Sequence, residues 1–299
     1  MRFAIRDDDT SYFTRPDALE AVWGRVLPYA PVSLAVTPFA LRATHMGDPV
    51  RFYQGPDSGA VAENRELVLW INSHIAAGRA SVMCHGATHE YLRRSEFELI
   101  PEYIWKPPAR IAAETGRARR HLEETFGVPV NTFVPPGNGI SRRSIDAIRP
   151  HFRSVLASVS LRRPSDLRAD LAWPRLAARR LYFQLRHGII DPFGGQIQGT
   201  ALLPSFPLTA STRWEQIERQ LAACARLGAD FVVGTHYWEV GDGVRDVLDR
   251  LLDRAATLGC RFCTCDQLFG SEPAPPDPNP GRHPVLANRV GQQEGSPAR

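Results

Sequence analysis

The segment Phe3-Ala-Ile-Arg-Asp-Asp-Asp9 joins a short apolar run to three consecutive aspartates. A short apolar run followed by polar residues is typical of a buried strand in a parallel sheet. In parallel α/β domains, functional side chains come from the carboxyl ends of the strands. The segment therefore predicts a first strand over Phe3–Ile5 and a functional site at the aspartates that follow it.

The same pattern continues along the chain, where short apolar runs alternate with segments of helical periodicity. We expect further strands at Val32–Val36, Ala80–Cys84, Val130–Val134, Ser154–Ser158, Arg180–Leu185, Phe231–Gly234 and Arg261–Cys265. We expect helices at Asp17–Leu27, Glu63–Gly78, Pro108–Phe126, Ser141–His151, Thr212–Leu227 and Val244–Leu258. Strands separated by helices form parallel pairs with right-handed crossovers, so the pattern predicts one barrel-like α/β domain over residues 1–270.

The composition, with 43% hydrophobic and 23% charged residues, is typical of a globular protein with a full core. No apolar run is long enough to cross a bilayer. Five cysteines and the absence of an apolar leader predict a cytoplasmic protein with reduced thiols. Residues 271–299 are rich in Pro and Gly and lack periodicity, so we expect a disordered tail there.

The net charge of +4 comes almost entirely from arginine, because Lys106 is the single lysine. The arginines are scattered among acidic residues and form no basic stripe. This distribution is not typical of a nucleic-acid-binding protein, although it is compatible with a phosphate-bearing substrate.

Two further polar clusters follow predicted strands, namely His85-Gly-Ala-Thr-His89 and Thr235-His236-Tyr-Trp-Glu239. Histidines four residues apart fall on one face of a helical turn and can bind one ion. A carboxylate from Asp7–Asp9 would complete a catalytic zinc site with an open position, and a second could accept a proton from water. The alternative is that the aspartates cap a turn and that the histidines are unrelated.

Four motifs occur in a fixed order: Asp7-Asp8, His85-x-x-x-His89, Phe133-Val-Pro-Pro-Gly137 and His236. In this order residues 3–269 resemble the polysaccharide deacetylase-like superfamily, also called the NodB homology group or carbohydrate esterase family 4. The resemblance implies a distorted (β/α) barrel of about seven parallel strands. It also implies a hydrolase that removes acyl groups, usually N-acetyl, from amino sugars.

The resemblance implies a role for each matching residue. Asp7 would be the catalytic base and His236 the acid toward the leaving amine. The remaining three residues would bind a divalent metal ion, with Zn²⁺ as the expected ion: Asp8, His85 and His89.

The chain departs from the family pattern at two positions. The arginine that orients the base in the third motif is replaced by Val134, so another arginine, with Arg186 as a candidate, would have to take its role. The glycine after the two aspartates is replaced by Asp9. These departures leave open a catalytically silent, glycan-binding member of the same fold. A glycosyltransferase that uses Asp7–Asp9 to bind a metal and a nucleotide diphosphate is a further alternative, but it leaves both histidines unexplained.

Three residues near the predicted site are candidates for substrate binding: Asn138, Trp238 and Tyr91. Asn138 follows the third motif, and the two aromatic residues could stack on a sugar or pack in the core. The expected substrate is an amino-sugar compound, and a nucleotide- or lipid-linked form would suit the arginine excess.

Overall fold

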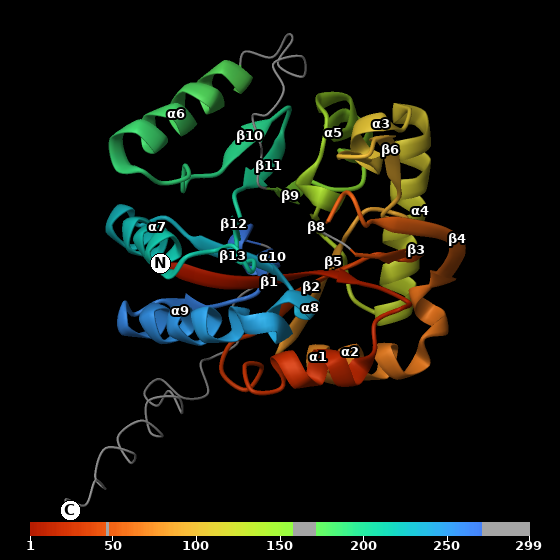
Figure 1. The fold of residues 1–299 in the computed structure, drawn as a ribbon, viewed down its shortest axis with the longest axis horizontal. Coiled ribbons are helices and arrows are strands. Elements are labelled where there is room, and N and C mark those ends of the chain that lie inside the picture. Colours follow the sequence, from red (N-terminus) through yellow and green to blue (C-terminus); the bar gives the residue numbers. More distant parts are fainter. Residues whose placement is uncertain (46–47, 158–171, 271–299) are drawn as a thin grey trace, which may run out of the picture.

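The first strand is longer than expected and runs through all three aspartates. In the computed structural model, which describes residues 1–45, 48–157 and 172–270, β1 spans Arg2–Thr10. It lies parallel to β13 (Phe231–His236) on one side and to β2 (Val32–Val36) on the other (Figure 1). The register pairs Asp8 with His236, so two of the predicted motifs are neighbours across one pair of strands.

β1 and β13 belong to a ten-stranded sheet with the order β10-β11-β9-β8-β5-β2-β1-β13-β12, and β14 pairs with β1 beside this path. Its other strands are β5 (Ala80–Cys84), β8 (Thr132–Phe133), β9 (Ser154–Leu156), β10 (Gly195–Ile197), β11 (Thr200–Leu203), β12 (Phe206–Pro207) and β14 (Arg261–Phe262). Every neighbouring pair from β11 to β12 along this order is parallel. The sheet curls into a half-barrel, which confirms the predicted class of a distorted (β/α) barrel (Figure 1).

The helices pack around this sheet, and two antiparallel hairpins, β3–β4 and β6–β7, lie outside it (Figure 1). The hairpin strands are β3 (Phe39–Thr44), β4 (Tyr53–Ala60), β6 (Tyr91–Ser95) and β7 (Glu98–Pro101). The helices are α1 (Pro16–Trp23), α2 (Arg65–Ala76), α3 (Glu102–Trp105), α4 (Pro108–Phe126), α5 (Arg142–Ile148), α6 (Ala172–His187), α7 (Trp214–Leu227), α8 (Tyr237–Glu239), α9 (Arg245–Thr257) and α10 (Cys265–Leu268). Within the described residues, none of these helices combines the length and the apolar character needed to cross a membrane.

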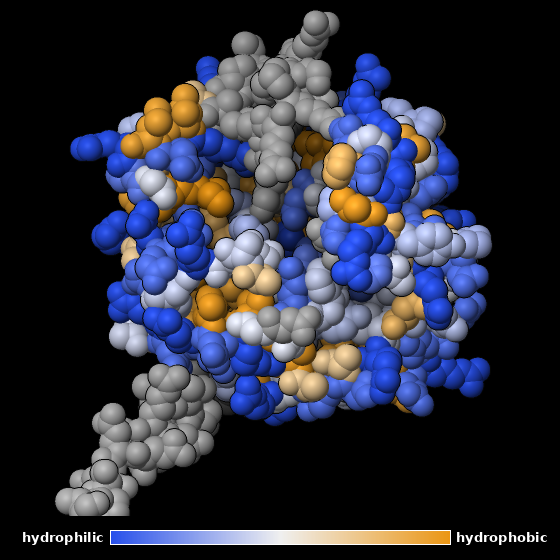
Figure 2. Space-filling model, in the orientation of Figure 1, coloured by the Kyte–Doolittle hydropathy of each residue, from blue (hydrophilic) through white to orange (hydrophobic). Residues whose placement is uncertain are grey.

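The expected strand at Arg180–Leu185 is wrong, because these residues lie within α6. Leu181 and Leu185 are 57% and 77% exposed, so the apolar residues there do not form a buried strand. The face shown in Figure 2 carries several apolar areas among hydrophilic ones. The expected tail at residues 271–299 and the end of the expected strand at Ser154–Ser158 lie outside the described residues.

The two faces of the sheet carry different cores, because successive side chains of a strand point to opposite faces. Phe3 and Ile5 of β1 belong to the large cluster that packs against the helices. Ala4 belongs to a smaller cluster inside the curl, together with Val134 and Leu156. Even-numbered residues of β1 therefore face the inside of the half-barrel.

Asp7 follows this alternation and lies on the helix-covered face. Its side chain is fully buried, and its Oδ2 accepts a hydrogen bond of 2.8 Å from Nε1 of Trp23 in α1. Burial raises the pKa of Asp7 well above its usual value, and the hydrogen bond from Trp23 only partly offsets this effect. The interaction anchors α1 to the central strand of the sheet.

We expect Trp23→Phe to lower the free energy of unfolding by about 1–3 kcal/mol, because it removes the side-chain donor of a buried carboxyl group. Urea unfolding measures this loss. The control is Trp70→Phe, which removes an exposed hydrogen bond of the same kind, from Trp70 Nε1 to Glu20 Oε2 (2.9 Å). Equal losses in the two variants would contradict a special role for the Asp7–Trp23 contact.

Candidate active site

The end of β1 breaks the alternation of the strand. The register with β2 shifts between Asp7 and Thr10, and Asp9 has a left-handed backbone with φ of 69°. Because this conformation reverses the direction of the side chain, Asp9 does not follow Asp7 onto the helix-covered face. Its carboxylate instead points toward the loop that carries the two predicted histidines.

His85 and His89 lie on a loop between β5 and β6, and not on the helical turn that their spacing predicts. The loop turns through left-handed residues, with φ of 71° at Gly86 and 57° at His89. Its shape brings the two imidazole rings to 4.9 Å between centroids. Nε2 of His85 lies 3.1 Å and Nε2 of His89 lies 2.9 Å from the same oxygen, Oδ1 of Asp9.

The tautomer of His85 is set by a backbone contact. Its Nδ1 lies 3.0 Å from the carbonyl oxygen of Val134, so Nδ1 carries the hydrogen and donates it. The lone pair of Nε2 is then free to face Asp9. An imidazole held in this way by its other nitrogen is typical of a metal ligand.

Asp9, His85 and His89 therefore form a group that fits a divalent ion. Within the described residues, one ligand atom from each lies within 4.8 Å of the other two. One carboxylate and two imidazoles suit Zn²⁺ with an open coordination position. Burial alone would raise the pKa of Asp9, but its interactions with His89, His236 and His85 outweigh this and hold the pKa well below its usual value.

The expected ligand set contained Asp8, whereas the group that the structure brings together contains Asp9. Asp8 lies on the inner face of β1 and pairs with Arg6, whose Nη2 is 2.6 Å from Asp8 Oδ2. Asp7, the expected base, lies on the opposite face against Trp23. The sequence could not resolve this shift, because it depends on the irregularity at Asp9.

Arg6 is a buried charged residue beside the site that the sequence interpretation did not single out. It is 2% exposed, and its guanidinium donates to Asp8, to Oδ1 of Asn138 (3.0 Å) and to the carbonyl oxygen of Leu156 (3.3 Å). A Cβ at Gly234 would lie 3.2 Å from Arg6 Nε, so the strand beside it needs a small residue. The available signal was a charged residue two positions before Asp8, and therefore on the same face of the strand.

His236 lies at the end of β13, on the other side of Asp9. Its Nδ1 is 2.8 Å from Oε2 of Glu239, and its Nε2 is 3.5 Å from Oδ2 of Asp9. Its ring stacks on Trp238 with centroids 4.7 Å apart. Burial lowers the pKa of His236, but Asp9, Glu239 and Asp8 together raise it to about 9.

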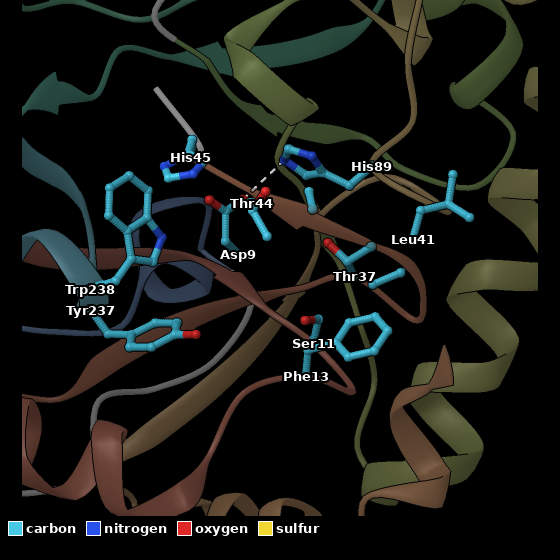
Figure 3. Close-up of a pocket in the computed structure, with 12 residues that line it drawn as sticks. Asp9, Ser11, Phe13, Thr37, Leu41, Thr44, His45, His89, Tyr237 and Trp238 are labelled. Atoms are coloured by element: carbon cyan, nitrogen blue, oxygen red, sulfur yellow. Dashed lines mark ion pairs between the residues drawn. The ribbon is translucent and has the colours of Figure 1, made fainter. Parts of the chain in front are cut away.

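A cavity of about 390 Å³ opens beside these groups. Asp9, His89 and Trp238 line it, together with Phe13 and Leu41, and Figure 3 shows their side chains around one space. The rest of its lining comes from β3 and from residues next to the ends of β1, β2, β3 and β13: Ser11, Thr37, Ala40, Ala43, Thr44, His45 and Tyr237. The β3–β4 hairpin, which the sequence did not predict, thus supplies much of one wall.

The three residues expected to bind substrate have different surroundings. Trp238 lines the cavity. Tyr91 packs against the ring of His89 with centroids 5.3 Å apart, and Asn138 holds Arg6. The last two are not among the residues that line the cavity.

The comparisons with known proteins identify similar folds only. No family model and no curated protein matches the chain. Solved structures that match include the CE4 domain of a multidomain xylanase from the hindgut metagenome of Trinervitermes trinervoides (10% identity, 92% of each chain, TM-score 0.47). A family 4 acetyl xylan esterase from Clostridium thermocellum, in complex with a cobalt ion, matches at 13% identity (90% of this chain, 91% of that chain, TM-score 0.45). A polysaccharide deacetylase described from Mycobacterium smegmatis matches at 11% identity (90% and 89%, TM-score 0.49).

These proteins fall in the group that the sequence motifs resemble. At this level of similarity an activity has to be argued from the site itself.

The geometry predicts different effects for substitutions of the three aspartates. Asp9→Asn should lose bound Zn²⁺, because it removes the only carboxylate in the ligand group, whereas Asp8→Asn and Asp7→Asn should keep it. Metal analysis after equilibrium dialysis measures the difference, with His89→Ala as the reference for loss. Retained zinc in Asp9→Asn together with loss in Asp8→Asn would restore the ligand set expected from the sequence.

Proposed function

We propose that the chain is a metal-dependent N-deacylase that removes an acyl group, most simply acetyl, from an amino-sugar substrate. Asp9, His85 and His89 would hold the ion, Asp8 would be the base and His236 the acid. The observation that carries the proposal is the register of β1 and β13, which sets Asp8 beside His236 next to the three-residue ligand group. A base and an acid on either side of one ion are what amide hydrolysis needs.

The ion would supply Lewis acidity toward the acyl carbonyl and toward the attacking water. Asp8 would accept a proton from that water, because its carboxylate is ionically paired and lies at the end of β1, one residue from Asp9. Arg6 holds one oxygen of Asp8, and Asn138 holds Arg6 in turn. These contacts fix the direction of the base before substrate binds.

His236 would deliver a proton to the departing amine nitrogen. The contact of its Nδ1 with Glu239 leaves Nε2 facing the site, on the side of Asp9. A carboxylate at Nδ1 stabilises the protonated ring and fixes its orientation. Trp238, stacked on the ring, limits its rotation.

The cavity supports a sugar more than a charged ligand. Phe13, Tyr237 and Trp238 offer aromatic faces, on which the apolar side of a sugar ring can stack. Among the described residues, its lining contains no arginine and no lysine. The expectation of a nucleotide- or lipid-linked substrate therefore rests on the overall arginine content and receives no support from this cavity.

The two alternatives receive less support. A D-x-D site of a glycosyltransferase needs Asp7 and Asp9 on one ion, but Asp7 is buried against Trp23 on the helix-covered face. The silent, glycan-binding alternative rested on the replacement of the family arginine by Val134. Arg6 supplies a guanidinium to Asp8 in its place, which removes the main reason to expect inactivity.

The test is amine release from a panel of N-acyl amino sugars by the zinc-loaded protein. His236→Gln should lose on the order of 10²-fold in turnover on these amides, the scale of a general acid. The same variant should lose far less on a nitrophenyl ester of the same acid, because nitrophenolate leaves without a proton. Asp8→Asn is the matched comparison and should lose activity on both. Zinc-loaded wild-type protein that releases no amine from any member of the panel would favour the silent alternative.

A second prediction concerns the arginine that orients the base. We expect Arg6→Ala to reduce turnover on the order of 10²-fold while it keeps zinc, because misdirecting a base by about 1 Å has an effect of that size. Arg6→Ala combined with Val134→Arg returns the arginine to the position that the family resemblance implies, and it should recover part of the loss. Full activity in Arg6→Ala, with zinc content and thermal midpoint unchanged, would show that Asp8 needs no guanidinium.

A further inference from the structure

The loop that carries His85 and His89 is tied down by one buried carboxylate. Oε1 of Glu102 accepts hydrogen bonds from the backbone N–H groups of Ala87 (3.0 Å), Thr88 (3.3 Å) and His89 (3.1 Å). Oε2 of the same residue accepts a hydrogen bond of 2.8 Å from the hydroxyl of Thr88. One side chain thus satisfies three successive donors that no regular secondary structure could satisfy.

One of these hydrogen bonds comes from the backbone of His89, a residue of the ligand group that has a left-handed conformation. The left-handed backbone of His89 aims its N–H at Glu102 while its ring reaches Asp9. Residues with a side chain adopt this conformation only where the surroundings hold them in it. Gly86 leaves room for the approach, because a Cβ there would lie 2.4 Å from Glu102 Oε1.

Glu102 is completely buried, so its charge needs a partner. That partner is Lys106, whose Nζ lies 2.6 Å from Glu102 Oε2 and whose side chain is 1% exposed. Lys106 also contacts Glu114 of α4 (2.9 Å) and Glu90 at the end of the loop (3.1 Å). The single lysine of the chain is therefore the centre of a buried ionic cluster behind the loop.

We propose that Glu102 and Lys106 are positioning residues for the metal-binding loop, and that this pair sets the affinity of the site for its ion. The proposal rests on the ligand group named under the proposed function. Neither residue lines the cavity or belongs to the ligand group. Glu102 holds the loop through the backbone of residues 87–89 and the hydroxyl of Thr88, and Lys106 holds it through Glu102, Thr88 and Glu90. Outer contacts of this kind change metal affinity by roughly 10- to 100-fold when they are removed.

The experiment is zinc competition with a chromophoric chelator at a temperature where every variant is folded. Glu102→Gln keeps the volume and one acceptor oxygen but loses the charge, and Lys106→Met removes the partner. Both should weaken zinc binding by about 10-fold or more, whereas Lys106→Arg should keep more of the affinity than Lys106→Met. The control is Glu218→Gln, which removes the Arg254–Glu218 pair of α9 and α7 (3.1 Å).

The outcomes separate this inference from the proposed function. Stoichiometric zinc in the wild type that His89→Ala abolishes, with unchanged affinity in Glu102→Gln and a lower thermal midpoint, would overturn the positioning role and leave the metal site intact. Zinc binding in the wild type that His89→Ala does not affect would instead overturn the metal site, and with it the inference.

Because Lys106 is the single lysine, its chemical modification provides a second measurement on the wild-type protein. This measurement tests the proposal even if Glu102→Gln does not fold. An amine-reactive reagent can modify only Lys106 and the N-terminal amine, and peptide mass spectrometry distinguishes the two. We expect Lys106 to react more slowly with zinc present than after chelation, because the ion and the cluster hold the same loop. Equal reaction rates in the two states would overturn the coupling.

Discussion

The site depends on the two-residue period of β1 and on its interruption at Asp9. Three consecutive aspartates acquire three different environments, because each faces a different direction. Asp7 faces Trp23 and the helices, Asp8 faces Arg6 inside the half-barrel, and Asp9 turns to the histidines. Three carboxylates on one face would repel one another strongly. Their separation lets the chain place two buried aspartates and one partly buried aspartate in succession, each with different partners.

Buried charges in this region are compensated one by one. Arg6 pairs with Asp8, Lys106 with Glu102, and Glu239 with His236. An unpaired charge at comparable burial would destabilise the fold by several kcal/mol. Asp9 differs from the other carboxylates because its neighbours are three histidines, which are cationic only when protonated. A divalent ion would provide the positive charge that this position favours, without requiring protonated ligands.

The sequence predicts the parts of the structure that depend on local pattern. The expected strands at Val32–Val36 and Ala80–Cys84 coincide with β2 and β5, because fully buried strands read as continuous apolar runs. The β3–β4 hairpin was not predicted, since exposed and partly buried residues such as Tyr53 and Leu41 give no clear alternation.

Local sequence pattern also could not define the whole candidate site. Spacing indicated His85 and His89 as candidate ligands, but it could not show that Asp9 lies beside them, because that depends on an irregularity in strand register. Glu102 lies 13 residues beyond His89, and only the folded chain brings its carboxylate back to the loop.

The limited space inside the half-barrel restricts which side chains can stand at positions 6 and 134. Val134 is completely buried in the same inner cluster as Leu156, whose carbonyl oxygen accepts a hydrogen bond from Arg6. Arg6 already places its guanidinium beside Asp8, with Nη2 2.6 Å from Oδ2. Two guanidinium groups against one carboxylate would leave a buried positive charge without a partner, which is strongly unfavourable. Once Arg6 occupies this place, an apolar residue at position 134 is the side chain that the packing accepts. Under the proposed function, Arg6 of β1 would supply the guanidinium that the family resemblance implies at position 134.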